Sequence, residues 1–221
     1  QFSGRQPATV ALDVGLSVIR LGLPVIVVLL LQELFSVEFD RRFFLISTTY
    51  PRPRYIFLLG RFFAVLLLVL ALLLVLSTIV GASVMVVQEQ YEQATPVVLD
   101  YRYFVVIAFL ALDILAIAAV GTLLAVTAKT PSFVLIGTLG FMLAARSFSA
   151  IVALLQRESY LVPNSNEYQS SLNLLGYVLP ALAALDVRMI ALYGQMEFLP
   201  YDWPARVIAI LGYVVAMWAG S

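Results

Sequence analysis

Long runs of apolar residues dominate the chain, and they determine the elements that the sequence predicts. Four segments, residues 9–31, 62–87, 104–127 and 133–155, each hold the roughly 20 mainly apolar residues that a helix needs to cross a bilayer. A fifth apolar run, residues 203–219, is shorter. We predict membrane-spanning helices over these segments, within a single all-α transmembrane domain that comprises residues 1–221.

A sixth apolar stretch, residues 172–193, is interrupted. Pro180 breaks it, and the charged residues Asp186 and Arg188 follow. Proline removes a backbone hydrogen bond, and a broken helix persists at membrane depth only where protein or water covers the freed groups. We therefore predict a re-entrant or external pair of short helices here rather than a full span.

Composition supports a membrane protein and narrows its chemistry. Hydrophobic residues make up 62% of the chain and charged residues 12%, against roughly 45–50% and 25% in soluble domains. The absence of cysteine and histidine disfavours a metal site, and the balanced charge gives no reason to expect nucleic acid as a partner. An intramembrane enzyme is a weaker alternative, because Asp113 has no acidic companion at its depth.

The charges between the helices predict the orientation. Residues 32–61 are rich in arginine, whereas residues 88–102 hold three acidic residues and a single arginine, Arg102. Because basic loops stay on the cytoplasmic side, we place the first segment in the cytoplasm and the second outside. The beginning of the chain then lies outside, and we expect a further helix before it.

The first of these segments contains an amphipathic helix, predicted over residues 36–48. Phe35, Phe39, Phe43 and Ile46 recur at helical spacing. The prolines that follow the helix stop it and stiffen the turn into the next span. Such a helix either lies at the lipid interface or docks on a cytoplasmic partner.

The residues within and after this helix resemble a known sequence signature. Glu38, followed by Pro51-Arg52-Pro53-Arg54-Tyr55-Ile56-Phe57-Leu58-Leu59-Gly60-Arg61, resembles the cytoplasmic signature of type-2 ABC transporter permeases. Arg42 stands where that family usually has glycine, and Pro53 where it usually has serine. A looser likeness, from Gly176 to Gly194, is to the external segment of the subgroup associated with multicopper-enzyme maturation.

The resemblance implies an architecture and a role. It implies the six-helix plan of an ABC exporter-type permease whose first helix is absent from this chain, in the bacterial inner membrane. A second permease subunit, identical or different, would complete a dimer, and separate cytoplasmic ATPases would bind ATP and Mg. This chain would be a non-catalytic subunit without a cofactor, and residues 36–48 would be the coupling helix. The residues expected to serve ATPase coupling are Glu38, Arg41, Arg42, Pro51, Arg52, Arg54, Gly60 and Arg61.

Three charged residues fall near the middle of predicted spans: Arg20, Asp113 and Arg146. A charge there costs about 2.5 kcal/mol or more, so each needs a partner or water. We expect Asp113 to pair with Arg20 or Arg146, leaving the other arginine to face a cavity, a dimer seam or the missing helix. The pair is either a structural device or part of a translocation path. An ion-driven secondary transporter that uses Asp113 is the alternative to the ABC permease.

Overall fold

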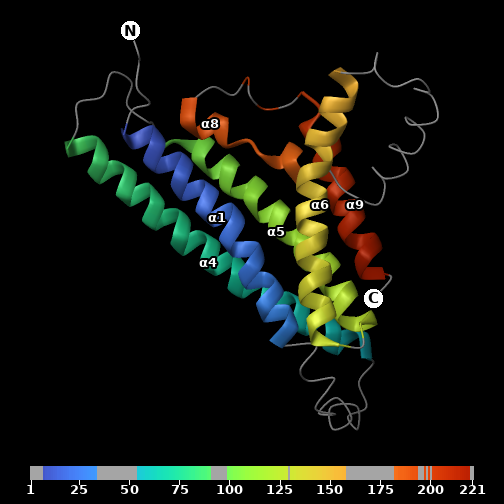
Figure 1. Ribbon diagram of the computed structural model, residues 1–221. Helices are drawn as coiled ribbons and strands as arrows, with labels where there is room; N and C mark the ends of the chain where they lie inside the picture. The colour runs from blue at the N-terminus through green and yellow to red at the C-terminus, as the bar shows by residue number, and fades with distance from the viewer. Residues whose placement is uncertain are drawn as a thin grey trace.

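The structure is a computed structural model that describes residues 7–33, 54–90, 99–128, 130–157, 182–193, 197, 199 and 201–219. Within these ranges the chain is helical and forms no strand, as predicted. The elements, in order, are α1 (Pro7–Leu31), α4 (Arg54–Gln90), α5 (Tyr101–Thr127), α6 (Pro131–Arg157), η3 (Leu182–Leu185), α8 (Arg188–Tyr193) and α9 (Trp203–Ala219) (Figure 1).

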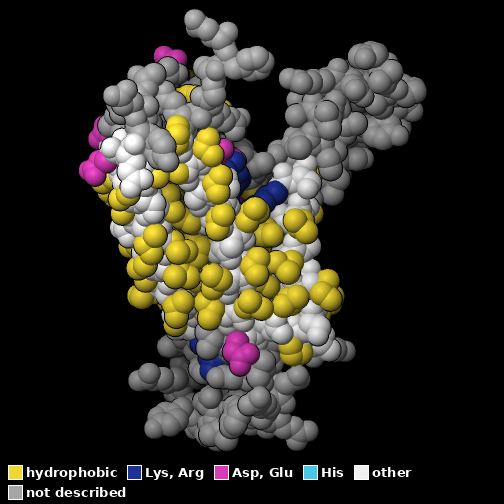
Figure 2. All heavy atoms as spheres, turned by 60° about the vertical axis from the view of Figure 1, so that its left-hand side comes forward, with side chains coloured by type: hydrophobic (Ala, Val, Ile, Leu, Met, Phe, Trp, Pro, Cys, Tyr) yellow, Lys and Arg dark blue, Asp and Glu magenta, His cyan; other side chains and the backbone are white. Residues whose placement is uncertain are grey.

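Four of the described helices are long and apolar enough to cross a membrane. They are α1, α4 over Leu59–Gln90, α5, and α6 over Pro131–Phe148. Helix α9 has 17 residues, which gives a length of about 25 Å, short of the roughly 30 Å of a bilayer's hydrocarbon core. Figure 2 shows a broad hydrophobic band around the middle of one face, with charged side chains above and below it. These features indicate a multi-pass membrane protein.

Helix α1 illustrates how a membrane helix divides its surface. Val14, Val18 and Leu21 are exposed along one face, whereas Leu16 and Leu23 are buried on the other. Because hydrocarbon accepts apolar side chains from any direction, the exposed face needs no protein cover in a bilayer. The same division recurs on α4, α6 and α9.

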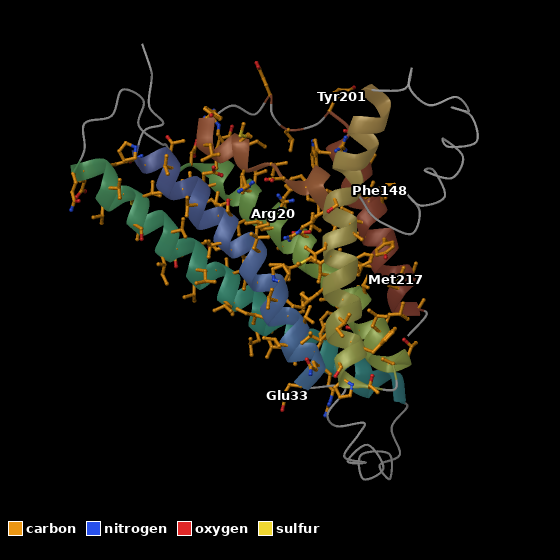
Figure 3. All side chains as sticks on the ribbon, in the orientation of Figure 1. Arg20, Glu33, Phe148, Tyr201 and Met217 are labelled. Carbon is orange, nitrogen blue, oxygen red and sulfur yellow. The ribbon has the colours of Figure 1, made fainter. Side chains whose placement is uncertain are left out.

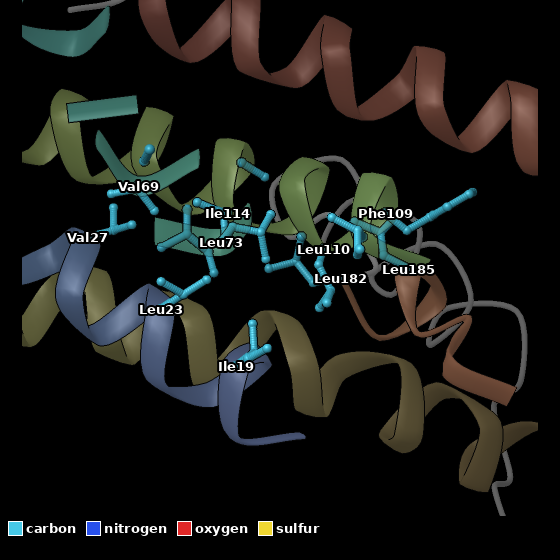
Figure 4. Close-up of a cluster of buried hydrophobic side chains, with 14 of the residues drawn as sticks. Ile19, Leu23, Val27, Val69, Leu73, Phe109, Leu110, Ile114, Leu182 and Leu185 are labelled. Carbon is cyan, nitrogen blue, oxygen red and sulfur yellow. The ribbon is translucent and has the colours of Figure 1, made fainter. Parts of the chain in front are cut away.

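Helix α5 lies at the centre of the bundle. Of its 18-residue apolar stretch, 67% is buried inside the bundle, against 22% of the corresponding stretches of α4 and α6. Helix α5 contacts α1, α4, α6, α8 and α9. Gly121 allows this approach, because a Cβ placed there would lie 2.5 Å from Leu31 Cδ1 and 3.3 Å from Thr138 Cγ2. Figure 4 shows the core where side chains of α1, α4, α5 and η3 meet.

Local sequence explains where the central helices begin and end. The Asp100 side chain accepts a 2.7 Å hydrogen bond from the backbone N–H of Tyr101 and caps the start of α5. Helix α5 ends before Ala128, and α6 begins at Pro131, where a proline without an N–H is tolerated in the first turn. This short connection makes α5 and α6 antiparallel neighbours.

The ends of the helices gather at two ends of the bundle. Figure 1 shows the end of α1, the start of α4 and the α5–α6 connection at one end. The start of α1, the end of α4 and α8 lie at the opposite end. Towards that second end, α1 and α4 diverge from α6 and α9, and η3 and α8 lie between them (Figure 1). Contacts of η3 with α5 and α6, and of α8 with α1 and α5, hold them there.

Candidate functional site

Most of the predicted coupling segment lies outside the described residues. This applies to residues 36–48 and to Glu38, Arg41, Arg42, Pro51 and Arg52. Arg54 is the first residue of α4, and Gly60 and Arg61 are its seventh and eighth residues. Gly60 is exposed, and a Cβ added to it would meet no described atom within 4 Å. The signature from Arg54 to Arg61 therefore belongs to the same continuous helix as the predicted span of residues 62–87.

The three charged residues at mid-span come together. Arg146 Nη2 donates a 2.7 Å hydrogen bond to Asp113 Oδ2, and Arg20 Nε lies 3.8 Å from the same oxygen. Asp113 is 1% exposed, so its carboxylate is buried between the two guanidinium groups. Figure 3 shows Arg20 about halfway along the bundle. Helices α1, α5 and α6 each contribute one member of this central triad, Arg20, Asp113 and Arg146.

Pro24 gives the triad a further contact. Proline lacks an N–H, so the carbonyl four residues earlier, that of Arg20, has no helical donor. Helix α1 continues through Pro24, and Arg146 Nη2 donates a 2.9 Å hydrogen bond to the Arg20 carbonyl. A helix-breaking residue in α1 thus provides an acceptor for a guanidinium group of α6.

A second carboxylate engages Arg20 from the short elements. Arg20 Nη1 pairs with Asp186 Oδ2, and Arg20 Nη2 donates a 3.2 Å hydrogen bond to the carbonyl of Leu182 in η3. Both arginines near Asp113 therefore have protein partners. This differs from the expectation that one of them faces a cavity, a dimer seam or a missing helix, because residues 182–193 fold back against α1, α5 and α6.

Arg188 extends the ion pairs towards the start of α1. Its guanidinium binds both oxygens of Asp186, with Nε 2.7 Å from Oδ1 and Nη2 2.9 Å from Oδ2. Its Nη1 lies 3.2 Å from Asp13 Oδ1 and donates to Ser17 Oγ. The charges alternate in sign along a charge chain, defined as Arg146, Asp113, Arg20, Asp186, Arg188 and Asp13.

Exposure is lowest at Asp113 and is higher towards the Asp13 end of this charge chain. The Asp113 side chain is 2% exposed, Arg20 and Arg146 are 12% and 13% exposed, and Asp186 and Asp13 are 26% and 33% exposed. The chain therefore runs from the buried centre of the bundle towards its surface at the end where α1 begins. Figure 2 shows basic side chains in a hollow at the upper border of the hydrophobic band.

Not every polar atom of the triad is used. Asp113 Oδ1, Arg146 Nε and Arg146 Nη1 are buried and have no hydrogen-bond partner among the described residues. A buried donor or acceptor without a partner costs about 1–3 kcal/mol, and more when it is charged. The centre of the bundle therefore contains three unsatisfied polar atoms among the described residues.

Outside the spans, the pairs also shift pKa values. Burial alone raises the pKa of Asp186, but hydrogen bonds from Arg188 and the charge of Arg20 outweigh burial and lower it overall. The hydrogen bond to Asp186 raises the pKa of Arg188 against the effect of burial. Both shifts favour the charged forms, so this part of the charge chain is ionic at neutral pH.

The sequence identifies three members of the charge chain and misses the other three. In the sequence, Asp186 and Arg188 stand out only as interruptions of a broken apolar segment, and no pattern singles out Asp13. The spacing of two residues between Asp186 and Arg188, in an otherwise apolar stretch, is the signal that could have found them. Their contacts with α1 join residues far apart in the sequence, so a single sequence does not reveal them.

The described residues contain no group of three or more acidic side chains arranged to hold a metal ion. Comparisons with protein-family models, with curated proteins and with solved structures give no match for this chain.

Proposed function

We propose that this chain is the membrane-spanning permease subunit of an ATP-driven ABC transporter, an exporter of the bacterial inner membrane. It pairs with a second permease subunit and binds cytoplasmic ATPase subunits that hold ATP and Mg. Residues 36–48 act as the coupling helix, and residues 172–193 form an external or re-entrant segment. The chain itself catalyses no reaction.

The observation that supports this proposal best is the course of α4. This helix has 37 residues, which gives a length of about 55 Å, far more than the roughly 30 Å of the hydrocarbon core. It begins at Arg54, so the signature residues Arg54, Gly60 and Arg61 share one helix with a membrane span. A rigid helix of this kind can carry a displacement at its cytoplasmic end into the membrane as a rigid-body motion.

The contacts of α4 give that motion a route to the charge chain. A Cβ at Gly15 of α1 would lie 2.7 Å from Val80 Cγ1 of α4, so these two helices approach closely. Helix α1 also carries Asp13, Ser17 and Arg20. A shift of α4 therefore acts first on the helix that holds Asp13 and Arg20 of the charge chain.

An ion-driven carrier is the second candidate. The buried Asp113, with Oδ1 unpaired among the described residues, is the observation that favours it. However, Asp113 Oδ2 is 2.7 Å from Arg146 Nη2, so a transported cation would compete with a guanidinium group for this carboxylate. The ABC proposal needs no such exchange.

The deciding experiment reverses the charge of the coupling segment. We expect the double variant Arg52→Glu and Arg54→Glu to lose the ATPase subunit during purification from its native membrane, because guanidinium groups pair specifically with carboxylates. Arg206→Glu, an exposed position at the start of α9, is the matched control and should retain the subunit. An ATPase bound equally by both variants, or by neither variant nor wild type, contradicts the proposal.

A labelling experiment tests the orientation separately. The chain has no cysteine, so a thiol reagent can label this chain only at the single cysteine that is introduced. Ser47→Cys should react with an impermeant thiol reagent only after the membrane is opened, whereas Gln93→Cys should react in intact cells. The reverse pattern would place the predicted coupling helix outside and end the proposal.

A further inference from the structure

Building on the proposed transport function, we propose that Arg20 and Arg146 form a binding site for an oxyanion, a carboxylate or phosphate group, on the transported molecule. Asp186 occupies part of this site as an internal ligand that the oxyanion replaces. The site lies at the centre of the bundle, and the charge chain leads from it towards the end where α1 begins.

The charges of the central triad require an anion. Arg20 and Arg146 carry two positive charges and Asp113 one negative charge, so the triad alone has a net charge of +1 (+2 − 1). An uncompensated charge is costly at mid-membrane depth. The Asp186 carboxylate supplies the missing negative charge through Arg20 Nη1. A group that replaces it must therefore also be an anion with oxygen acceptors.

Arg146 offers donors for such a group. Its Nη2 binds both Asp113 and the Arg20 carbonyl, while Nε and Nη1 are buried without a partner among the described residues. Guanidinium nitrogens of this kind bind carboxylate or phosphate oxygens through charge-assisted hydrogen bonds. Asp113 Oδ1 is an acceptor for a hydroxyl or N–H group next to the anion on the same ligand.

Asp186 keeps a cationic partner when it releases Arg20. The Arg188 guanidinium binds both Asp186 oxygens, so the carboxylate keeps a bidentate partner when an incoming anion takes Arg20. Arg188 in turn keeps Asp13. The exchange swaps one anion for another at Arg20, and Asp186 and Asp13 then share Arg188, so that no carboxylate is left without a cationic partner.

The exposure of Asp186 indicates the side from which a ligand approaches. Asp186 lies in the two-residue connection between η3 and α8, which fill the space where α1 and α4 diverge from α6 and α9 (Figure 1). Its side chain is 26% exposed, against 2% for Asp113. A ligand that enters from this end meets Asp186 and Arg188 before it reaches the triad.

The test uses the full chain in nanodiscs of phosphatidylcholine, with acetate and inorganic phosphate as probes and chloride as the ionic-strength control. We expect Asp186→Asn to bind acetate or phosphate at least about tenfold more tightly than wild type, measured as a rise in melting temperature, because an internal ligand at high effective concentration has been removed. Asp186→Asn combined with Arg20→Gln should lose this response. An equal response to chloride, or a response that survives Arg20→Gln, overturns the proposal.

Asp202→Asn is the matched control, since Asp202 pairs with Arg206 at an exposed position; it should respond as wild type does. A lipid source is distinguished by replacing part of the phosphatidylcholine with phosphatidylglycerol. If this stabilises Asp186→Asn without added acetate or phosphate, the anion is a lipid headgroup, whereas a response to the dissolved probes alone identifies a soluble anion.

If Asp186→Asn cannot be isolated folded, competition between Asp186 and the added anion for Arg20 is measured in a chain that keeps Asp186 and carries only Met189→Cys. Acetate, but not chloride, should then speed thiol labelling of Met189→Cys on α8, and equal rates in both salts overturn the proposal. No ATPase subunit is present in these assays. Failure of anion binding is therefore separate from failure of ATPase coupling.

Discussion

The two halves of helix α1 differ in whether ion pairs help to hold them in the bundle. The first half, residues 7–20, carries Asp13, Ser17 and Arg20, which contact Arg188, Asp186 and the triad. The second half, residues 21–31, has no charged residue. It packs mainly by apolar contacts, with Leu23, Val27 and Leu31 buried. The first half thus adds ion pairs to apolar packing such as the close approach of Gly15 to Val80, whereas the second half depends on packing alone.

Two glycines allow close packing at the end of the bundle where α1 ends. Gly121 of α5 lets Leu31 and Thr138 approach its backbone. Gly137 of α6 lies against α5, since a Cβ added to it would be 3.1 Å from Leu124 Cδ1. In lipid there is little hydrophobic force between helices, so close contact of this kind is what holds them together. Apolar side chains packed in this way have no charged partner that another ion could replace.

The comparison indicates which part of the bundle can open. An ion pair in a protein interior is strong, but another charged group can take the place of either member. Packed apolar surfaces have no such substitute. We infer that the end of the bundle near the charge chain is the exchangeable end, and that the end near Gly121 stays closed while the other responds.

The largest effect is expected from Asp113→Asn. It leaves Arg20 and Arg146 without their shared carboxylate, and removing one partner of a buried pair costs about 3–5 kcal/mol. We expect a marked loss of folded protein in detergent, measured by size-exclusion chromatography and thermal unfolding. Asp202→Asn should unfold as wild type does.

The same variant separates the two roles that the sequence leaves open. If transport per assembled complex is unchanged in Asp113→Asn, the triad is only structural. A loss of transport in complexes that still assemble supports a role in translocation. A normal melting temperature would show that the ion pairs do not hold this half of α1.

The second prediction concerns the apolar half. Gly121→Leu inserts a side chain where Leu31 Cδ1 and Thr138 Cγ2 already lie within 2.5 and 3.3 Å of the added Cβ, and such overpacking costs about 1–3 kcal/mol. Thermal unfolding measures the loss. Gly140→Leu is the matched control, because no described atom lies within 4 Å of a Cβ there. Equal destabilisation by both variants would argue against a closely packed end.

A smaller effect is expected from acid. The pKa of Asp186 is lowered in the folded protein, so its stabilising contribution is present above the unfolded-state pKa of about 3.9 and is lost as pH falls through the lower folded-state value. Wild type should therefore lose more melting temperature than Asp186→Asn between about pH 5 and pH 3. Parallel curves for the two proteins would contradict the ionic assignment of this pair.

The sequence predicted the four long helices because their signal is local. Apolar runs of sufficient length are recognised without knowledge of distant residues. Helix α4 is longer than the predicted 62–87, since the arginines and aromatics from Arg54 onward are compatible with a helix that extends beyond the hydrocarbon core.

The site was predicted only in part. The cost of charges in lipid identified Arg20, Asp113 and Arg146 as a group in need of partners, and the structure brings them together. The role of Asp186 follows from the return of residues 182–193 to α1, which no local pattern specifies. The contact of Arg146 with the carbonyl freed by Pro24 likewise depends on the packing of α6 against α1.

The difference between the two halves of α1 can be measured with single cysteines at Ile19 and Val27, which are both buried. In the Asp186→Asn background, a small impermeant thiol reagent should react faster with Ile19→Cys than it does in the otherwise wild-type chain, while its reaction with Val27→Cys should not change. Equal acceleration at both positions, or at neither, would contradict an exchangeable charged end and a closed apolar end.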